Sequence, residues 1–255
     1  MIVNARMYSA TPQAKAAWKK VLGGVIGRAG LDWELLDYDA PAPLSALWAR
    51  DDLGAAMMCG LPYSQRRPRP QLVAAPIPSP ARYGGRPIYF TDLAVRADAP
   101  YKTLEDTFGG VVGYTLPDSM SGCVALRAHL APYGRKVYRQ AVGGFVNARQ
   151  VIEALDARRI DVGPLDSYYY DLLRAGDPEL ASKVCIIAST AAAPIPPLIA
   201  TAVLAPEVLE RLRAAFLAVE EQPELLLKGF AVPALSDYDQ MEQALAASRS
   251  FPETW

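Results

Sequence analysis

Apolar positions along the chain follow two different spacings. Short runs of consecutive apolar residues predict buried strands, and longer segments with apolar residues three and four positions apart predict helices. The first expected strands and helices alternate, as residues 2–7, 14–29, 33–36, 44–50 and 53–59. The order strand, helix, strand, helix, strand is typical of a parallel sheet with right-handed crossovers.

A second set of elements follows a passage rich in proline. Residues 62–87 hold seven of the chain's 22 prolines and are expected to be irregular. The strands expected beyond this passage are residues 88–96, 110–114, 136–141, 160–165, 183–190 and 198–204, and the helices are residues 103–108, 122–133, 147–157 and 206–219. The pattern predicts an α/β protein of two lobes with a double crossover between them, residues 1–92 plus 191–255 forming one lobe and residues 93–190 the other.

The segment between the strand at 110–114 and the helix that follows it carries the main candidate site. It contains Ser119, Met120, Ser121 and Gly122. The first N–H groups of a helix have no partner within the helix, and the positive end of the helix dipole points the same way, so such starts bind anions. The two serine hydroxyls add uncharged donors, although a plain helix cap remains the alternative for each. We therefore expect a small-anion site here.

The ends of other expected strands supply the remaining candidates. Asp166 follows the strand at 160–165, where its carboxylate could bind an amino group of a ligand or cap the next helix. Tyr168 belongs to a run of three tyrosines, of which at most two can face a cleft. The other candidates are Tyr8, Thr11, Tyr63, Ser64 and Tyr89. Capping of a turn or packing in the core is the alternative for each of them.

Charge and composition exclude several classes of partner. The chain has 26 basic and 27 acidic residues, a net charge of -1, and therefore no overall field that would attract nucleic acid. No segment approaches the roughly 18 uninterrupted apolar residues of a membrane-spanning helix. Three widely spaced cysteines and one histidine predict neither a disulfide framework nor a metal site, and no cofactor is expected. The start lacks a signal-peptide pattern, which indicates a cytoplasmic protein if the sequence is complete and a periplasmic one if a leader was removed.

Four blocks of the sequence resemble, in order, the phosphate/phosphonate-binding proteins of ABC importers. Residues 89–100 resemble the crossover strand of that family, residues 104–110 its helix and turn, residues 118–122 its ligand loop, and residues 160–168 its segment ending in Asp-Ser-Tyr. The resemblance extends from about Leu53 to about Leu204. It implies a type 2 periplasmic-binding-protein fold, in which each lobe is a mixed, mostly parallel sheet flanked by helices and the lobes close on a ligand.

Two positions depart from the family pattern. Met120 stands where the ligand loop usually has threonine, and Gly143-Gly144-Phe145 replaces a turn that resembles Gly-Ser-His in the family. The second change removes polar side chains from a turn that contacts ligand in the family. The resemblance therefore implies a small ligand with an anionic group more firmly than it implies phosphonate itself.

Two functions stay open on this basis. The resemblance implies a solute-binding protein that captures phosphonate, phosphate or a similar anion in a cleft between lobes for ABC-type uptake or sensing, with an ABC permease or a signalling protein as partner. The alternative is a cytoplasmic enzyme on the same fold that acts on a small carboxylate or phosphorylated metabolite, because fold does not fix function. Few candidate acids and bases are present, so binding is favoured and no catalytic residue is assigned.

Overall fold

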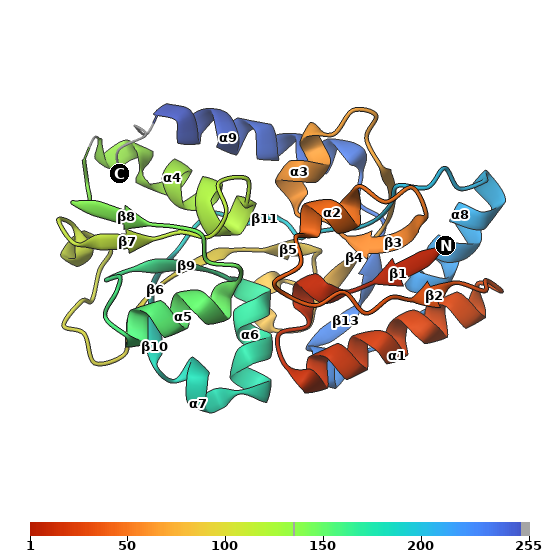
Figure 1. Cartoon of the computed structure of the whole chain (residues 1–255), viewed down its shortest axis with the longest axis horizontal. Helices are drawn as coiled ribbons and strands as arrows, with labels where there is room; N and C mark the ends of the chain where they lie inside the picture. The colour runs from red at the N-terminus through yellow and green to blue at the C-terminus, as the bar shows by residue number, and fades with distance from the viewer. Residues whose placement is uncertain (135, 251–255) are drawn as a thin grey trace. The chain divides into compact units, whose positions relative to one another are not determined.

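The computed structural model describes residues 1–134 and 136–250, which form two compact units. Unit 1 comprises Met1–Ile88 and Pro194–Tyr238, and unit 2 comprises Tyr89–Ala193 and residues 239–250. The chain therefore passes between the units three times (Figure 1). The predicted division placed all residues after 190 in the first lobe. The structure instead groups helix α9 (Gln240–Ser250) with unit 2, because α9 packs along α4 (Ala125–Leu130) of that unit.

Unit 1 is built on one six-stranded mixed sheet in the order β13-β4-β12-β3-β1-β2. Its strands are β1 (Ile2–Asn4), β2 (Glu34–Leu35), β3 (Leu53–Met57), β4 (Gln71–Pro78), β12 (Leu198–Ala200) and β13 (Leu227–Ala231). Strand β1 pairs in parallel with β2 and β3, as the alternating sequence pattern predicts, whereas β12, β4 and β13 pair antiparallel. The mixed α/β class is confirmed, with a larger antiparallel share than expected because β12, formed after the chain returns from unit 2, lies between β3 and β4.

The helices of unit 1 follow local signals in the sequence. Helix α1 (Pro12–Arg28) begins where Thr11 caps it, the Thr11 hydroxyl oxygen accepting a hydrogen bond of 3.1 Å from the Ala14 amide, with Pro12 at the first helical position. The buried face of α1 includes Trp18 and Leu22, and the helix packs against β1, β2 and α8. The other helices of this unit are α2 (Leu44–Trp48), α3 (Gly60–Gln65) and α8 (Pro206–Leu217).

The proline-rich passage is not irregular throughout, and that prediction is wrong. It contains the greater part of α3, which begins at Gly60, and the eight-residue strand β4. The prolines obscured a buried apolar run, residues 72–75, which pairs with β12. Pro76 and Pro78 lie beyond the part of β4 that pairs with β12, so their missing N–H groups interrupt no bond on that side.

Unit 2 holds a three-stranded antiparallel sheet and a two-stranded parallel one. Strand β6 (Thr91–Arg96) lies between β9 (Gly163–Asp166) and β10 (Val184–Ser189), and β7 (Val111–Gly113) pairs with β8 (Gln140–Val142). Its further helices are α5 (Ala148–Asp156), α6 (Ser167–Gly176) and α7 (Pro178–Ala181), and β5 (Ile88–Tyr89) pairs with β11 (Ala193–Pro194). The strand expected at 136–141 lies later, at β8, and the helix expected at 103–108 is a single 3-10 turn, Glu105–Thr107.

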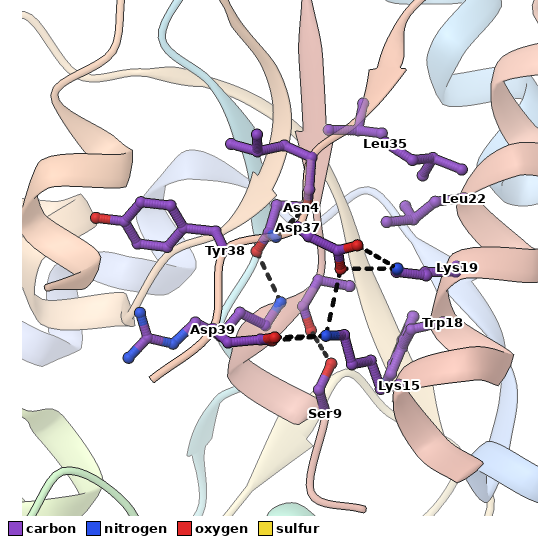
Figure 2. Close-up of a pocket in the computed structure, with 14 residues that line it drawn as sticks. Asn4, Ser9, Lys15, Trp18, Lys19, Leu22, Leu35, Asp37, Tyr38 and Asp39 are labelled. Atoms are coloured by element: carbon purple, nitrogen blue, oxygen red, sulfur yellow. Dashed lines mark hydrogen bonds and ion pairs between the residues drawn. The ribbon is translucent and has the colours of Figure 1, made fainter. Parts of the chain in front are cut away.

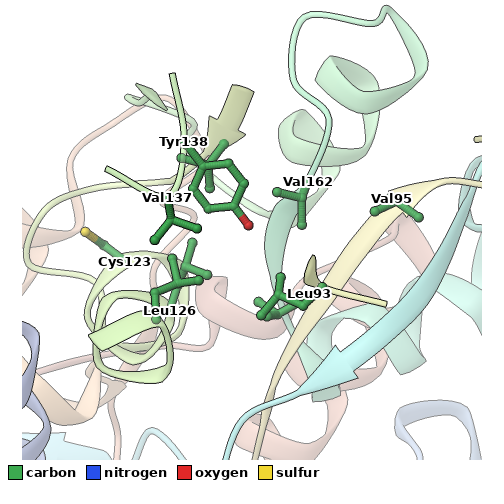
Figure 3. Packing of buried hydrophobic residues seen from close by; sticks show 10 residues of the cluster. Leu93, Val95, Cys123, Leu126, Val137, Tyr138 and Val162 are labelled. Atoms are coloured by element: carbon green, nitrogen blue, oxygen red, sulfur yellow. The ribbon is translucent and has the colours of Figure 1, made fainter. Parts of the chain in front are cut away.

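The core of unit 2 brings together side chains from β6, β7 and α4. Leu93, Val112, Leu126 and Val162 are fully buried in one cluster. Figure 3 shows Leu93, Leu126 and Val162 together with Tyr138 of the same cluster. This packing fixes the start of α4 against the sheet, and that start is the candidate anion-binding turn. None of the helices formed by the described residues has the length and apolar character needed to span a membrane.

Helix α1 contains two exposed glycines, and replacing them with alanine tests whether both positions are helical and open to solvent. A Cβ atom at Gly24 or Gly27 would meet no atom within 4 Å. Since glycine in a helix interior costs about 0.5–1 kcal/mol relative to alanine, Gly24→Ala and Gly27→Ala should each raise the free energy of unfolding by about that amount. Urea unfolding would measure the change, and a loss of stability would contradict the exposed helical position.

Candidate functional site

The candidate anion-binding turn is a π-helical turn, Met120–Val124, that leads into α4. Ser119 caps it, because the Ser119 Oγ accepts a hydrogen bond of 3.1 Å from the Gly122 amide. The Cys123 and Val124 amides donate to the Ser119 carbonyl at 3.1 and 3.0 Å. Across residues 1–134 and 136–250, no group accepts a hydrogen bond from the Ser121 amide or hydroxyl. The turn thus uses Ser119 as a cap and leaves the donors of Ser121 for another partner.

Gly122 is required by the close approach of Thr115. A Cβ atom at Gly122 would lie 1.7 Å from Thr115 Oγ1, and the Thr115 amide donates to the Gly122 carbonyl at 2.9 Å. On the other side of the turn, the Thr91 hydroxyl donates to the Ser121 carbonyl at 3.2 Å. The turn is therefore fixed to the segment after β7 and to β6. Thr91 and Thr115 could not be identified from local sequence signals, since only the folded chain brings their side chains to the turn.

Asp166 lies near the same turn within unit 2. It pairs with Thr91 in the β6–β9 ladder, and Thr91 in turn holds Ser121. The Asp166 carboxylate caps α6, with Oδ1 accepting from the Tyr168 and Tyr169 amides at 3.1 Å each. The capping alternative is thus realised for one carboxylate oxygen, and ligand contact by Asp166 remains a prediction.

Two predicted aromatic contacts of unit 2 are buried. Tyr168 and Tyr89 are 0% and 1% exposed. Burial raises the pKa of the Tyr168 phenol well above its ordinary value, because the apolar surroundings disfavour the phenolate. Packing accounts for the position of both rings, and their contact with ligand remains a prediction.

The four candidates of unit 1 are buried and engaged locally. The Thr11 hydroxyl caps α1, and the Ser64 hydroxyl donates to the Leu61 carbonyl at 2.9 Å. Tyr63 packs edge-to-face against Tyr238 with 5.0 Å between ring centroids, and Tyr8 is buried. Their role toward a ligand stays a prediction.

A pocket in unit 1 with an empty volume of about 320 Å³ has a charged mouth between α1 and the segment after β2 (Figure 2). Lys15 Nζ lies 2.7 Å from an oxygen of Asp39 and 3.2 Å from one of Asp37, and Lys19 Nζ lies 2.7 Å from Asp37. The hydrogen bonds from Lys19 and Lys15 hold the pKa of the Asp37 carboxyl below its usual value. Each ammonium group already faces a carboxylate, and Arg6, which also lines the pocket, donates a hydrogen bond to the Ala42 carbonyl.

The chemistry of unit 2 near the turn does not favour covalent catalysis. Burial raises the pKa of the Cys123 thiol to about 11, and burial also lowers the pKa of His129. A protonated thiol is a poor nucleophile near pH 7. Within the described part of the chain, no three His, Cys, Asp or Glu side chains gather as a metal site requires.

Thiol labelling would test this environment. Cys59 and Cys123 are buried and Cys185 is exposed. We expect the Ellman reagent to modify Cys185 rapidly in the native protein at pH 8 and all three thiols after unfolding in guanidinium chloride. Mass spectrometry of the labelled peptides would identify the sites, and rapid native labelling of Cys123 would contradict its burial.

Comparisons with known proteins agree with this fold. The family model described as "ABC transporter, phosphonate, periplasmic substrate-binding protein" matches residues 14–247. A binding-protein component of an ABC phosphonate transporter from Pseudomonas aeruginosa is similar in structure, with a TM-score of 0.79, 19% identity, and coverage of 98% of this chain and 87% of that chain. PhnD1 from Prochlorococcus marinus, solved with methylphosphonate, gives a TM-score of 0.78 at 12% identity and covers 98% of both chains.

A more distant similarity involves a Xanthomonas citri protein bound to chloride ion, with a TM-score of 0.67 and 17% identity over 98% of this chain and 97% of that one. No curated protein sequence matches the chain. At these identities the solved structures show the fold, and they confirm the predicted type 2 periplasmic-binding-protein fold.

Proposed function

Since the chain belongs to the family of periplasmic substrate-binding proteins of phosphonate ABC transporters, we propose that its Ser119–Gly122 turn binds the anionic group of the transported solute. The solute-binding role predicted from the sequence is confirmed by the family match, which spans residues 14–247. The assignment of that role to particular residues is our proposal. It concerns the part of unit 2 where the sequence and the geometry point to the same turn.

The proposal rests on two hydrogen-bond donors of Ser121, its backbone amide and its hydroxyl. Its amide and hydroxyl donate to no other described group, and its carbonyl is held by Thr91. The Ser119 hydroxyl accepts at the cap, and its proton is available to a ligand. Hydrogen bonds to a charged group contribute about 1.5–3 kcal/mol each, so a few such donors can supply much of the affinity for a small anion.

The remaining contacts are proposed by position. In unit 2 they are Met120 within the turn, Asp166 and Tyr168 at the start of α6, and Tyr89 at the start of the unit. In unit 1 we propose Tyr8, Thr11, Tyr63 and Ser64, each of which lies near the carboxyl end of a parallel strand or in the helix that follows it. Ligands of open α/β sheets bind at such ends, which supports this assignment.

Membership of this family also suggests the partner and the compartment of the protein, and both are part of our proposal. The loaded protein would deliver its anion to an ABC permease in the periplasm. The alternative within the same family role is that the protein senses the anion and reports it to a signalling partner. The raised pKa of Cys123 gives no support to an enzyme that uses this thiol as a nucleophile.

A ligand screen on the full chain tests the proposal. Isothermal titration calorimetry with methylphosphonate, inorganic phosphate, sulfate and acetate should give saturable one-site binding for at least one phosphorus oxyanion, with no chemical change in the recovered ligand. Failure of all four anions to bind would contradict the anion site. Recovery of a converted product would favour the enzyme alternative.

A further inference from the structure

We propose that Thr91 positions the anion-binding turn and couples it to residues 189–193, the exit segment through which the chain leaves unit 2. This role rests on the proposed function of the Ser119–Gly122 turn. It goes beyond support of the turn, because Thr91 also holds Thr190 of the exit segment. An anion bound at the turn should therefore stabilise the exit segment.

Thr91 uses its side chain and its backbone toward different partners. It is the first residue of β6 and is buried, with 2% of its surface exposed. Its hydroxyl donates to the Ser121 carbonyl, within the turn, at 3.2 Å. Its amide donates to the Thr190 hydroxyl oxygen at 3.1 Å, and its carbonyl accepts from the Thr190 amide at 2.9 Å. One buried residue thus joins the turn to the exit segment.

The hydrogen bond from Thr91 fixes one peptide plane of the turn. The Ser121 carbonyl and the Gly122 amide belong to the same planar peptide unit. Thr91 holds the oxygen of this unit, and the Ser119 hydroxyl oxygen accepts from its N–H at 3.1 Å. The side chain of Ser121 is attached next to this plane, so the direction of its hydroxyl depends on both bonds. Loss of the Thr91 hydroxyl would release the carbonyl side of the plane.

Thr91 and Thr190 lie near the points where the chain enters and leaves unit 2, whose main segment is Tyr89–Ala193. A second bond joins the same two stretches of chain, since the Ser189 hydroxyl donates to the buried Asp92 carboxylate at 2.7 Å. Hinges between units of a protein commonly consist of a few residues at the ends of elements. The exit segment is in such a position, and Thr91 connects it to the anion-binding turn.

Thermodynamic linkage gives this connection a measurable consequence. A ligand slows only those opening motions that weaken its own binding. Opening of the exit segment breaks the bonds between Thr190 and Thr91, and it thereby loosens the support of Ser121. The bound anion must then oppose that opening. With the anion at 100 times its Kd, hydrogen exchange of the Thr190 amide should slow by up to about 100-fold.

The test measures hydrogen exchange of single amides by NMR in the full chain. The probe is methylphosphonate, or inorganic phosphate should only phosphate bind, at about 100 times the Kd of each variant. In wild type, the anion should slow exchange of the Thr190 amide by about tenfold or more. The Lys102 and Thr103 amides are the internal control, because they donate to the exposed Asp106 carboxylate, and their exchange should not change.

Thr91→Val keeps the shape and the backbone pairing of this residue and removes its hydroxyl. It should raise the Kd about threefold to tenfold and reduce the anion-induced slowing at Thr190 to less than about twofold. Thr91→Ser keeps a hydroxyl and should preserve both wild-type values. Thr107→Val is the matched control, since it removes another buried hydroxyl of unit 2, which donates to the Leu104 carbonyl at 2.6 Å. It should leave the Kd and the slowing unchanged.

The outcomes separate this role of Thr91 from the proposed function. If wild type binds neither methylphosphonate nor phosphate, the anion site is contradicted and the coupling falls with it. If wild type binds and exchange at Thr190 does not slow, or if Thr91→Val keeps the full slowing, the coupling through Thr91 alone is overturned. Should Thr91→Val not fold, Thr190→Val, which removes the acceptor of the Thr91 amide and no atom of the turn, must raise the Kd at least about twofold. An unchanged Kd in Thr190→Val would then overturn the coupling.

Discussion

Gly122→Ala is expected to weaken anion binding at least tenfold and to lower the free energy of unfolding by about 1–3 kcal/mol. The added Cβ would lie 1.7 Å from Thr115 Oγ1 and 2.7 Å from Thr115 Cβ, so either the turn or the segment after β7 must shift. A shift of the turn moves the donors of Ser121 away from the anion. Calorimetry with methylphosphonate and urea unfolding would measure the two effects.

The control for this variant keeps alanine at position 122 and removes the Thr115 side chain that it would meet. In the double variant Gly122→Ala plus Thr115→Gly, the atoms that meet the new Cβ are gone, and binding should recover in part. Gly27→Ala is the matched control for a glycine-to-alanine change with no neighbour within 4 Å, and it should leave binding unaltered. Wild-type affinity in Gly122→Ala would show that this close approach does not position the site.

The double variant Ser119→Ala plus Ser121→Ala is expected to raise the Kd for the bound anion by about tenfold to a hundredfold. It removes two hydroxyl donors, each contributing about 1.5–3 kcal/mol toward a charged acceptor, while partial replacement by water offsets some of the loss. Calorimetry with the anion that wild type binds most tightly is the measurement.

The single variants separate the two serines. Ser119→Ala also removes the cap on the Gly122 amide and should reduce the free energy of unfolding by about 1 kcal/mol. Ser121→Ala breaks no hydrogen bond donated by this side chain within the described residues, so its effect should be confined to binding. Unchanged affinity in the double variant, with a native melting temperature, would remove the anion site from this turn.

Local signals made much of unit 1 predictable. The Ser9–Pro12 segment indicated the start of α1, and the apolar run before Cys59 indicated β3. Strand β4 could not be predicted, because prolines dominate its surroundings and its burial depends on pairing with β12, more than a hundred residues later. The place of α9 in unit 2 likewise follows from its packing on α4, for which the sequence near the C-terminus holds no signal.

The candidate site was predictable only where it is local. Ser119, Ser121 and Gly122 carry their chemistry in one short segment at a helix start, so the sequence indicates both the donors and the cap. Thr91 in β6 and Thr115 in the segment after β7 support that turn, and only the folded chain brings them to it. The hydrogen bonds between Thr91 and Thr190 are of the same kind, since they join residues 99 positions apart.

The three passages of the chain between the units have a consequence for biosynthesis. Unit 1 lacks β12 and β13 until residues 194–238 have been made, and unit 2 lacks α9 until the residues after 239 have been made. Neither unit can therefore reach its final packing until these late segments have left the ribosomal tunnel. Stalled nascent chains that expose residues 1–193 alone should remain sensitive to protease in both units, and chains that also expose α9 should be resistant in both.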